Sequence, residues 1–299
     1  DKQVVASIVQ QADVLSQQFE YHILANHLFA NAKAMVFVGC FLKGDLGDKY
    51  LMHGLKVLVS EVDEQFLADG AHFELSPMYH SVMLWDMLEL IELSSLNSKL
   101  LTYKKYWIGI SQKSLNWLQA MCHPDGQISF FNDSTMGIAP KPSDIFDYAY
   151  KLGLKHPEPL EKLTLLSNSG YSRIESAEVS LILNHAQISP SYQPGHAHAD
   201  TLSFELSVGQ CRLFVNSGTS CYGDTNQRLQ ERKTNAHNTV EINGQDSSEV
   251  WGGFRVARRA NVSDLLVFKN DNHIKLTAEH DGYSRLIKGL LHQRSITVG

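Results

Sequence analysis

Residues 195–204 read GHAHADTLSF and lead into a run in which apolar and polar residues alternate from Leu202 to Val208. This alternation predicts a strand with one face in a core. His196 and His198 are two positions apart, so an extended strand presents both imidazoles on one face. Such a pair suits a shared metal ion, or a metal ligand beside a base, because imidazole titrates near neutral pH and binds metals. Two strand-end histidines without a chemical role fit the spacing equally well.

The chain around this stretch, from Gly170 onward, consists of short alternating runs separated by turn residues such as Asn243-Gly244 and Asp281-Gly282. A series of such runs between turns predicts strands in an antiparallel sandwich. We therefore assign residues 166–299 to an antiparallel β-sandwich. The predicted strands cover Tyr171–Ile174, Val179–Leu183, Leu202–Val208, Leu213–Val215, Thr239–Ile242, Leu265–Phe268, Ile274–Ala278 and Leu290–Val298.

The preceding part, residues 1–165, lacks this alternation and reads as helices. Apolar residues recur there at helical steps, and Gly- and Asp-rich breaks separate the segments, which is typical of stacked antiparallel helical hairpins. Ser76-Pro77 is a good helix start, because Ser caps a helix and Pro fits its first turn. The fold class is therefore α+β, with a domain boundary at about residue 165. The predicted helices cover Val4–Ala34, Tyr50–Leu67, Met78–Leu93, Leu101–Met121 and Ser143–Leu152.

The composition is that of a globular chain: 299 residues, 43% hydrophobic and 19% charged. It contains no apolar run of about 18 residues, the length that a transmembrane helix requires. The net charge of −6 argues against a nucleic-acid partner, because phosphate binding needs a basic face. The four cysteines lack Cys-x-x-Cys spacing and are expected to be free thiols. Because the chain starts at Asp1 and ends in a strand-like run, we expect a fragment truncated at both ends, with any signal segment upstream.

Two clusters in the helical half carry candidate chemistry. Asn26 and His27 occupy adjacent helical positions, so they can flank a pocket but not chelate one ion, and a solvated helix face is the simpler interpretation. The block from Asp69 to His80 is rich in ionisable and aromatic groups and precedes the capped helix. It can project Tyr79 and His80 into a cleft, where a tyrosine can pass protons in both directions. Ordinary packing also explains a tyrosine at this place.

Further candidates lie in the loops that follow. Asn132 and Asp133 form a polar patch after two aromatic residues, which suits a sugar site or a plain hydrogen-bonding turn. A zinc site needs three or four donors, and His198 and His237 with either Asn216 or Asp200 would supply them if the fold brings them together. Between the two candidates for the third donor, asparagine is a poorer zinc ligand than aspartate.

The second half also holds residues suited to an anionic sugar chain. Trp251, flanked by glycines, can stack on a sugar face or simply anchor its loop. Basic residues can form one groove in a net-negative protein, although ordinary solvated charges are at least as common. These basic residues are Arg228, Arg232, Lys233, Arg255, Arg258 and Arg259.

Taken together, six blocks resemble the heparinase II/III-like family of polysaccharide lyases, including its alginate-lyase-like branches. The resemblance covers essentially the whole chain. It implies an incomplete (α/α) toroid followed by an antiparallel β-sandwich, with the active cleft between them. The six blocks are Asn26-His27, Asp69 to His80, Phe131 to Ser134, Pro194 to Asp200, Asn216 to Thr219 and Ala236 to Val240.

The resemblance implies β-elimination on a uronate of an acidic polysaccharide. Asn26, together with His27, would neutralise the uronate carboxylate, which the loss of the C5 proton requires. Tyr79 would protonate the leaving oxygen and, for syn geometry, also take the C5 proton. His196 would be the base in the anti case or would assist Tyr79.

The resemblance also implies a structural zinc bound by His198, His237 and the residue at position 216. Family members with this metal usually carry aspartate there, so Asn216 is a departure. We also predict substrate contacts for a further set of side chains. This set is His80, Asn132, Asp133, Arg232 and Trp251.

We therefore predict a polysaccharide lyase in the bacterial periplasm or outside the cell, acting on an acidic polysaccharide. One alternative is a degenerate relative that only binds acidic polysaccharide in exopolysaccharide assembly or export. Another is a hydrolase, which would need two carboxylates across the cleft, such as Glu74 and Asp133. Neither a nucleic-acid partner nor a membrane span is expected.

Overall fold

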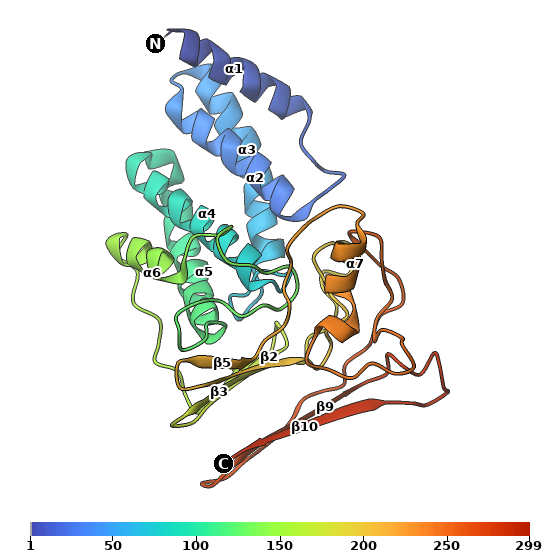
Figure 1. Cartoon of the computed structure of the whole chain (residues 1–299). Helices are drawn as coiled ribbons and strands as arrows, with labels where there is room; N and C mark the ends of the chain where they lie inside the picture. Colours follow the sequence, from blue (N-terminus) through green and yellow to red (C-terminus); the bar gives the residue numbers. More distant parts are fainter. Residues whose placement is uncertain (1) are drawn as a thin grey trace.

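The computed structural model describes residues 2–299 and shows a helical half followed by a half built of antiparallel sheets (Figure 1). Two groups of helices follow one another along the chain, α1 to α3 and then α4 to α6, and α2 packs along α3. The helices are α1 Lys2–Gln17, α2 Ala25–Phe41, α3 Asp45–Gln65, α4 Pro77–Leu96, the short 3-10 turn η1 Ser98–Leu100, α5 Leu101–Ala120 and α6 Pro142–Lys151.

The start of α4 forms as its sequence predicts. Ser76 caps the helix by accepting a hydrogen bond from the Tyr79 amide at 3.1 Å, and Pro77 occupies the first turn. The same Ser76 hydroxyl donates to the Asp133 carbonyl oxygen at 2.5 Å. The cap therefore also ties the polar loop at Asp133 to the beginning of α4, where Tyr79 lies.

The predicted continuous helix over residues 4–34 is wrong. The chain leaves the helix after Gln17 and re-enters it at Ala25, and both Leu24 and Ala25 have positive φ values, 66° and 51°. Glu20 fixes the connecting loop, because its amide donates to Asn31 Oδ1 at 2.8 Å. The loop contains neither Gly nor Pro, so no local signal marks the break.

The second half contains two larger antiparallel sheets that pack against each other through apolar side chains such as Ile174, Leu181 and Leu276 (Figure 1). The five-stranded sheet has the order β1-β2-β3-β4-β5, with β1 Leu163–Leu166, β2 Tyr171–Glu175, β3 Val179–Asn184, β4 Phe204–Val208 and β5 Cys211–Phe214. The three-stranded sheet has the order β10-β9-β8, with β8 Leu266–Lys269, β9 Ile274–His280 and β10 His292–Val298. Between the sheets in sequence lie α7 Asn226–Arg232, the 3-10 turn η2 Thr234–Ala236, and the hairpin of β6 Val250–Trp251 and β7 Arg255–Val256.

One predicted strand of this half does not form. The predicted strand Thr239–Ile242 is a loop with a single bridge between Ile242 and Gln245, because its groups bond to other loops, as when Thr239 donates to the Thr201 carbonyl. The predicted domain boundary at residue 165 falls inside β1.

The two halves meet across a buried apolar layer. Trp117 of α5 packs near Phe131, Tyr171 and Ile182, and its indole N–H donates to Ser169 Oγ at 2.9 Å. Burial of large aromatic side chains supplies much of the stability of such a contact. This layer fixes the start of α4 against the loops of the sheet half, and the candidate site lies at that junction.

Candidate active site

Tyr79 lies where the two halves meet and contacts two residues of the sheet half. Its ring stacks on the His196 imidazole, with centroids 3.9 Å apart and planes inclined by 12°. Its hydroxyl lies 3.0 Å from the hydroxyl of Tyr222. Tyr79 comes from the first turn of α4, whereas His196 and Tyr222 come from the loops before β4 and after β5. The fold thus assembles three proton-bearing groups from distant segments.

The Glu74 carboxylate contacts two histidines, His196 and His72. One carboxylate oxygen of Glu74 lies 2.9 Å from His196 Nδ1, and the other lies 3.7 Å from His72 Nδ1. Burial alone would lower the pKa of His196, but the Glu74 carboxylate raises it above its ordinary value. Burial would likewise raise the pKa of Glu74, but His196 holds it below the ordinary value. The two shifts describe a buried carboxylate that orients His196 and favours its protonated form.

Both tyrosine hydroxyls of the site stay protonated at neutral pH. Burial raises the pKa of Tyr79 to about 12, and the negative charges of Asp133 and Glu74 act in the same direction. Burial and Asp133 raise the pKa of Tyr222 as well. A hydrogen-bonded pair of neutral phenols can donate a proton to an oxygen atom that develops negative charge.

A buried ion pair supports this group. Asp133 binds the Arg228 guanidinium through both carboxylate oxygens, and Asp133 Oδ1 also lies 2.7 Å from His198 Nε2. Burial would raise the pKa of Asp133, but His198 and Arg228 hold it below its ordinary value. The guanidinium in turn lies over the rings of Tyr222 and Phe254, at 5.1 and 5.5 Å. Asp133 and Arg228 therefore position Tyr222 rather than face a substrate.

Of the three residues expected to bind zinc, His198 and His237 face each other, whereas Asn216 lies on the opposite side of the His237 ring. His198 Nδ1 is 3.3 Å from His237 Nε2, and Asn216 Oδ1 is 3.2 Å from the opposite ring nitrogen, His237 Nδ1. A zinc ion needs its donors to face one point at about 2 Å. Residues 2–299 also contain no metal-binding group of three or more His, Cys, Asp and Glu side chains. The two imidazole nitrogens are spaced as two ligands of one zinc ion would be, but Asn216 does not reach that point.

Asn26 and His27 lie at the start of α2, with His27 about half exposed and 3.4 Å from Glu20. Neither forms a hydrogen bond or ion pair with Tyr79 or His196 in the described part of the chain. A buried chain of contacts connects this helix start to the site through Gln65. The Gln65 amide donates to the Ala25 carbonyl at 2.9 Å, and its oxygen lies 2.9 Å from His72 Nε2. His72 is the residue that faces Glu74.

Three residues expected to contact substrate are buried, which argues against direct contact. His80 accepts a hydrogen bond from the His72 amide and donates to the Ser114 carbonyl, and burial lowers its pKa to about 3. Asn132 donates to the Leu75 carbonyl at 2.9 Å.

The third such residue, Arg232, has its guanidinium on the backbone carbonyls of Ala197 and Gly252. His80, Asn132 and Arg232 therefore use their polar atoms to hold loops around the site. Asp133 does the same through Arg228. From the sequence alone, a polar residue that holds a loop cannot be told apart from one that contacts substrate.

Sequence reasoning missed Tyr222. The residue follows the Asn216 to Thr219 block, and Gly218 in that block has φ of +66°. A Cβ atom on Gly218 would lie 2.2 Å from the Ser134 carbonyl oxygen, so only glycine lets this loop approach the Asp133 loop so closely. The sequence shows only an aromatic residue, Tyr222, four positions after Gly218. This spacing does not predict that Tyr222 contacts Tyr79.

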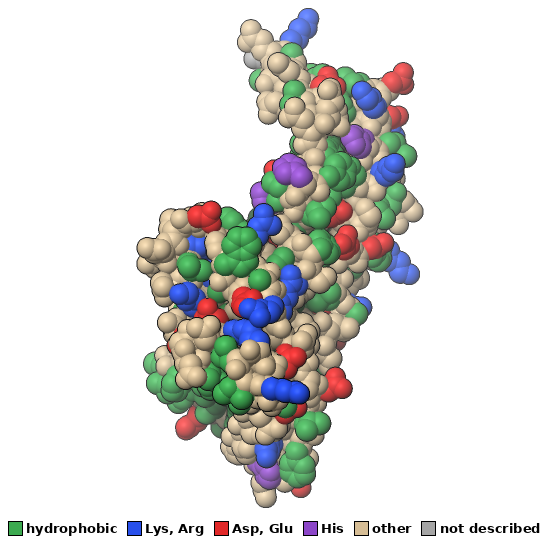
Figure 2. Space-filling view, turned by 90° about the vertical axis from the view of Figure 1, so that its right-hand side faces the viewer, with side chains coloured by type: hydrophobic (Ala, Val, Ile, Leu, Met, Phe, Trp, Pro, Cys, Tyr) green, Lys and Arg blue, Asp and Glu red, His purple; other side chains and the backbone are tan. Residues whose placement is uncertain are grey.

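A pocket of about 470 Å³ lies beside the aromatic residues of the site. Exposed rings line it, among them Tyr192, Trp251 and Phe254. The Phe254 ring stacks on Tyr222 with centroids 6.0 Å apart, so the pocket adjoins the tyrosine pair. On the face shown in Figure 2, Lys and Arg side chains gather near the middle of the molecule, mixed with acidic ones. The aromatic rings of the pocket and the Arg255 guanidinium in its lining together suit an acidic sugar chain.

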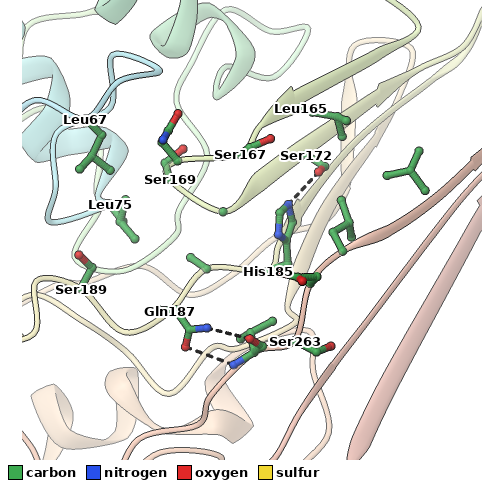
Figure 3. A pocket seen from close by; sticks show the side chains of 17 residues that line it. Leu67, Leu75, Leu165, Ser167, Ser169, Ser172, His185, Gln187, Ser189 and Ser263 are labelled. Carbon is green, nitrogen blue, oxygen red and sulfur yellow. Dashed lines mark hydrogen bonds between the residues drawn. The ribbon is translucent and has the colours of Figure 1, made fainter.

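A second pocket, of about 440 Å³, lies between the end of the five-stranded sheet and the segment before β8 (Figure 3). His185 Nε2 lies 2.8 Å from Ser172 Oγ there, and Gln187 pairs with the backbone of Val262. Burial lowers the pKa of His185 to about 4, so the imidazole is neutral. Its described lining includes no Lys, Arg or aromatic side chain, apart from the neutral His185 ring. It lacks the groups that an acidic sugar requires.

Comparison with known families matches both halves. The model described as "Heparinase II/III N-terminus" matches residues 2–146, and "Heparinase II/III-like, C-terminal" matches residues 158–299. A heparin-sulfate lyase of Bacteroides thetaiotaomicron is 22% identical over 91% of this chain and 44% of its own length. A heparin-sulfate lyase of Pedobacter heparinus is 25% identical over 89% of this chain and 43% of its own. The chain therefore spans less than half the length of these relatives.

Solved structures share the fold. The crystal structure of heparinase III superposes with a TM-score of 0.80 at 21% identity, covering 96% of this chain and 47% of that one. Heparan sulfate lyase HepC from Pedobacter heparinus superposes with a TM-score of 0.69 at 22% identity, covering 96% of this chain and 46% of that one. At this level of identity the likeness concerns the fold.

Proposed function

The chain belongs to the heparinase II/III-like family, and from that membership we propose that it is a polysaccharide lyase acting on a uronate-containing acidic polysaccharide. The observation that carries the proposal is the Tyr79 group, stacked on His196 and hydrogen-bonded to Tyr222 at the junction of the two halves. The curated relatives are heparin-sulfate lyases, so we propose a heparan-type glycan as the substrate. We also propose that the helices belong to an (α/α) toroid and the sheets to a β-sandwich.

The proposed reaction is β-elimination, in which the C5–H and C4–O4 bonds break and a C4–C5 double bond forms. Tyr79 is protonated in the free protein and lies at the site's centre, which suits it to donate the proton that the leaving oxygen needs. His196 first releases its own proton to solvent and then takes the C5 proton, while the Glu74 carboxylate lies 2.9 Å from its Nδ1. In syn geometry Tyr79 would first give up its own proton, then take the C5 proton and pass it to the leaving oxygen, and His196 would assist it.

We propose that the start of α2 neutralises the uronate carboxylate. Asn26 and His27 lie in the first turn, and the helix has no side-chain cap and no acidic residue there. Free amide groups and the helix dipole favour an anion at such an end. Substrate binding would bring the carboxylate between this helix start and Tyr79, which makes the C5 proton more acidic.

The hydrolase alternative conflicts with the carboxylates present. A glycoside hydrolase needs one carboxylic acid with a raised pKa and a second carboxylate across the cleft. Glu74 and Asp133 are both buried, both have lowered pKa values, and they bind His196 and Arg228. Neither is placed to protonate a glycosidic oxygen.

A structural zinc and the cellular location stay proposals. Zinc at His198, His237 and Asn216 would require Asn216 to leave His237 Nδ1, and no step above depends on it. One zinc per purified chain would support the metal, and full activity without any would contradict it.

We infer a periplasmic or secreted location from the family. None of the helices within residues 2–299 is long and apolar enough to cross a membrane.

The test is the ultraviolet absorbance of unsaturated uronate, measured on heparan sulfate, heparin, hyaluronan, chondroitin and alginate. Tyr79→Phe should reduce the rate at least about 100-fold, because it removes the proton donor. Tyr150→Phe is the matched control, since Tyr150 is an exposed residue of α6 and should leave the rate unchanged. Glycan binding with no unsaturated product would instead support the degenerate, non-catalytic relative.

A further inference from the structure

The β6–β7 hairpin presents an aromatic ring and a guanidinium side by side. Trp251 pairs directly with Arg255 across the two antiparallel strands, and directly opposed residues project from the same face. Both side chains are exposed, Trp251 to 57%, and both line the pocket of about 470 Å³. A flat apolar face beside a cation is the combination that binds a charged sugar.

The turn of this hairpin is fixed by the buried groups of the site. Arg228 Nε donates to the Gly253 carbonyl at 3.0 Å, and Arg232 donates to the Gly252 carbonyl at 3.0 Å. A Cβ atom on Gly253 would lie 2.6 Å from the Gly223 carbonyl oxygen, so the turn packs closely on the neighbouring loop. A surface that is already rigid loses little entropy when a ligand binds.

The pocket adjoins the catalytic group through Phe254. Phe254, at the tip of the hairpin turn, stacks on Tyr222 with planes inclined by 11°, and Tyr222 bonds to Tyr79. A single aromatic stack therefore separates the pocket from the proposed proton donor. A glycan whose uronate lies at Tyr79 would place an adjoining sugar in the pocket.

The charges of the pocket favour a sulfated sugar. Arg255 forms no ion pair within the described residues 2–299, and His22 lines the same pocket. The acidic lining residue is Asp224, and its Oδ1 already accepts the Gly253 amide at 2.6 Å. A free guanidinium binds a tetrahedral oxyanion through two parallel hydrogen bonds.

We propose that this pocket is a subsite for a sulfated sugar adjoining the cleaved uronate, with Trp251 stacking on the ring and Arg255 pairing with the sulfate. The subsite rests on the proposed lyase function for its place in the reaction. Its binding chemistry is independent of cleavage and can be measured without it.

The test uses tryptophan fluorescence of the Tyr79→Phe chain, which should bind glycans without cleaving them. Trp107 and Trp117 are fully buried and Trp85 is partly buried, so Trp251 is the tryptophan best placed to report binding in the pocket. We expect sulfated tetrasaccharides to bind about tenfold to 100-fold more tightly than unsulfated ones of the same backbone. Adding Arg255→Gln should make the two affinities nearly equal. Adding Trp251→Ala removes the reporter, so calorimetry measures binding to that variant, and both affinities should fall.

Lys151→Gln is the matched control, because it removes an exposed positive charge on α6 and should preserve the preference for sulfate. Equal binding of sulfated and unsulfated chains by the parent, or a sulfate preference that survives Arg255→Gln, would overturn the proposal, as would no binding at all. If instead the wild-type chain yields no unsaturated product while the Arg255-dependent binding persists, the lyase function fails and the subsite stands.

Discussion

Tyr79 and Tyr222 share a hydrogen bond of 3.0 Å, and this contact sets the first residue-scale prediction. Tyr222→Phe removes one hydroxyl while keeping the ring that stacks on Phe254. We expect kcat to fall about tenfold, since one hydrogen bond that orients the donor is lost. Steady-state kinetics with Tyr150→Phe as control measures the effect. A change confined to KM would show that Tyr222 binds substrate and does not orient Tyr79.

Glu74 is predicted to act through His196. Glu74→Gln keeps the shape but removes the charge 2.9 Å from His196 Nδ1. We expect kcat to fall about 100-fold with little change in the glycan Kd, because the loss concerns proton transfer. Both quantities should be compared with the urea unfolding curve. A loss of activity that parallels a loss of folded protein would assign Glu74 a structural role only.

The sequence predicts Tyr79 and His196 through local motifs, and the structure brings those two residues together. It does not predict that Arg232 is buried on backbone carbonyls, nor that Tyr222 reaches across to α4. These facts depend on contacts between distant segments, which no local pattern encodes.

At the scale of elements, the N-terminus of α4 carries a stability prediction. Ser76→Ala removes the cap on the Tyr79 amide and the bond to the Asp133 carbonyl. We expect the free energy of unfolding to fall by about 1 to 3 kcal/mol, as a lost cap and an unsatisfied buried carbonyl together imply. Urea unfolding measures this.

Ser60→Ala is the matched control for the cap. Ser60 lies in α3, and within residues 2–299 its hydroxyl donates a hydrogen bond to the Val57 carbonyl of the same helix. It should change stability by less than about 0.5 kcal/mol. Equal effects of the two substitutions would contradict the special role of the cap.

The sequence predicts some helices and strands of this chain and not others. The alternating runs at β2, β3, β9 and β10 predict strands because one face of each strand is apolar. The sequence does not predict the helix α7, because its residues are mostly polar. Tertiary hydrogen bonds of Arg228 and Arg232 hold it in place. The sequence does not predict the break before α2 either, because the residues with positive φ values are Leu24 and Ala25 and not glycines.

For the whole molecule, buried neutral histidines predict loss of stability in mild acid. Burial lowers the pKa of His72 to about 4 and that of His80 to about 3, from 6.5. Below about pH 6.5 the unfolded chain binds protons that the folded chain cannot, so stability falls as pH drops toward 4. Each pKa unit corresponds to about 1.4 kcal/mol, so the total loss should reach a few kcal/mol.

Urea midpoints measured from neutral pH down to about pH 5 test this expectation. The slope should be steepest below the ordinary pKa of histidine. A midpoint that stays constant or rises in acid would show that these imidazoles are not buried as neutral groups.

The central claim for the whole molecule is elimination at the junction of its two halves. Mass spectrometry of the products formed in heavy-oxygen water tests it most directly, with heparan sulfate oligosaccharides as substrate. The account predicts an unsaturated uronate at the new end and no oxygen from water in either product, with formation dependent on Tyr79. Saturated products that carry the heavy oxygen would show hydrolysis and contradict the account.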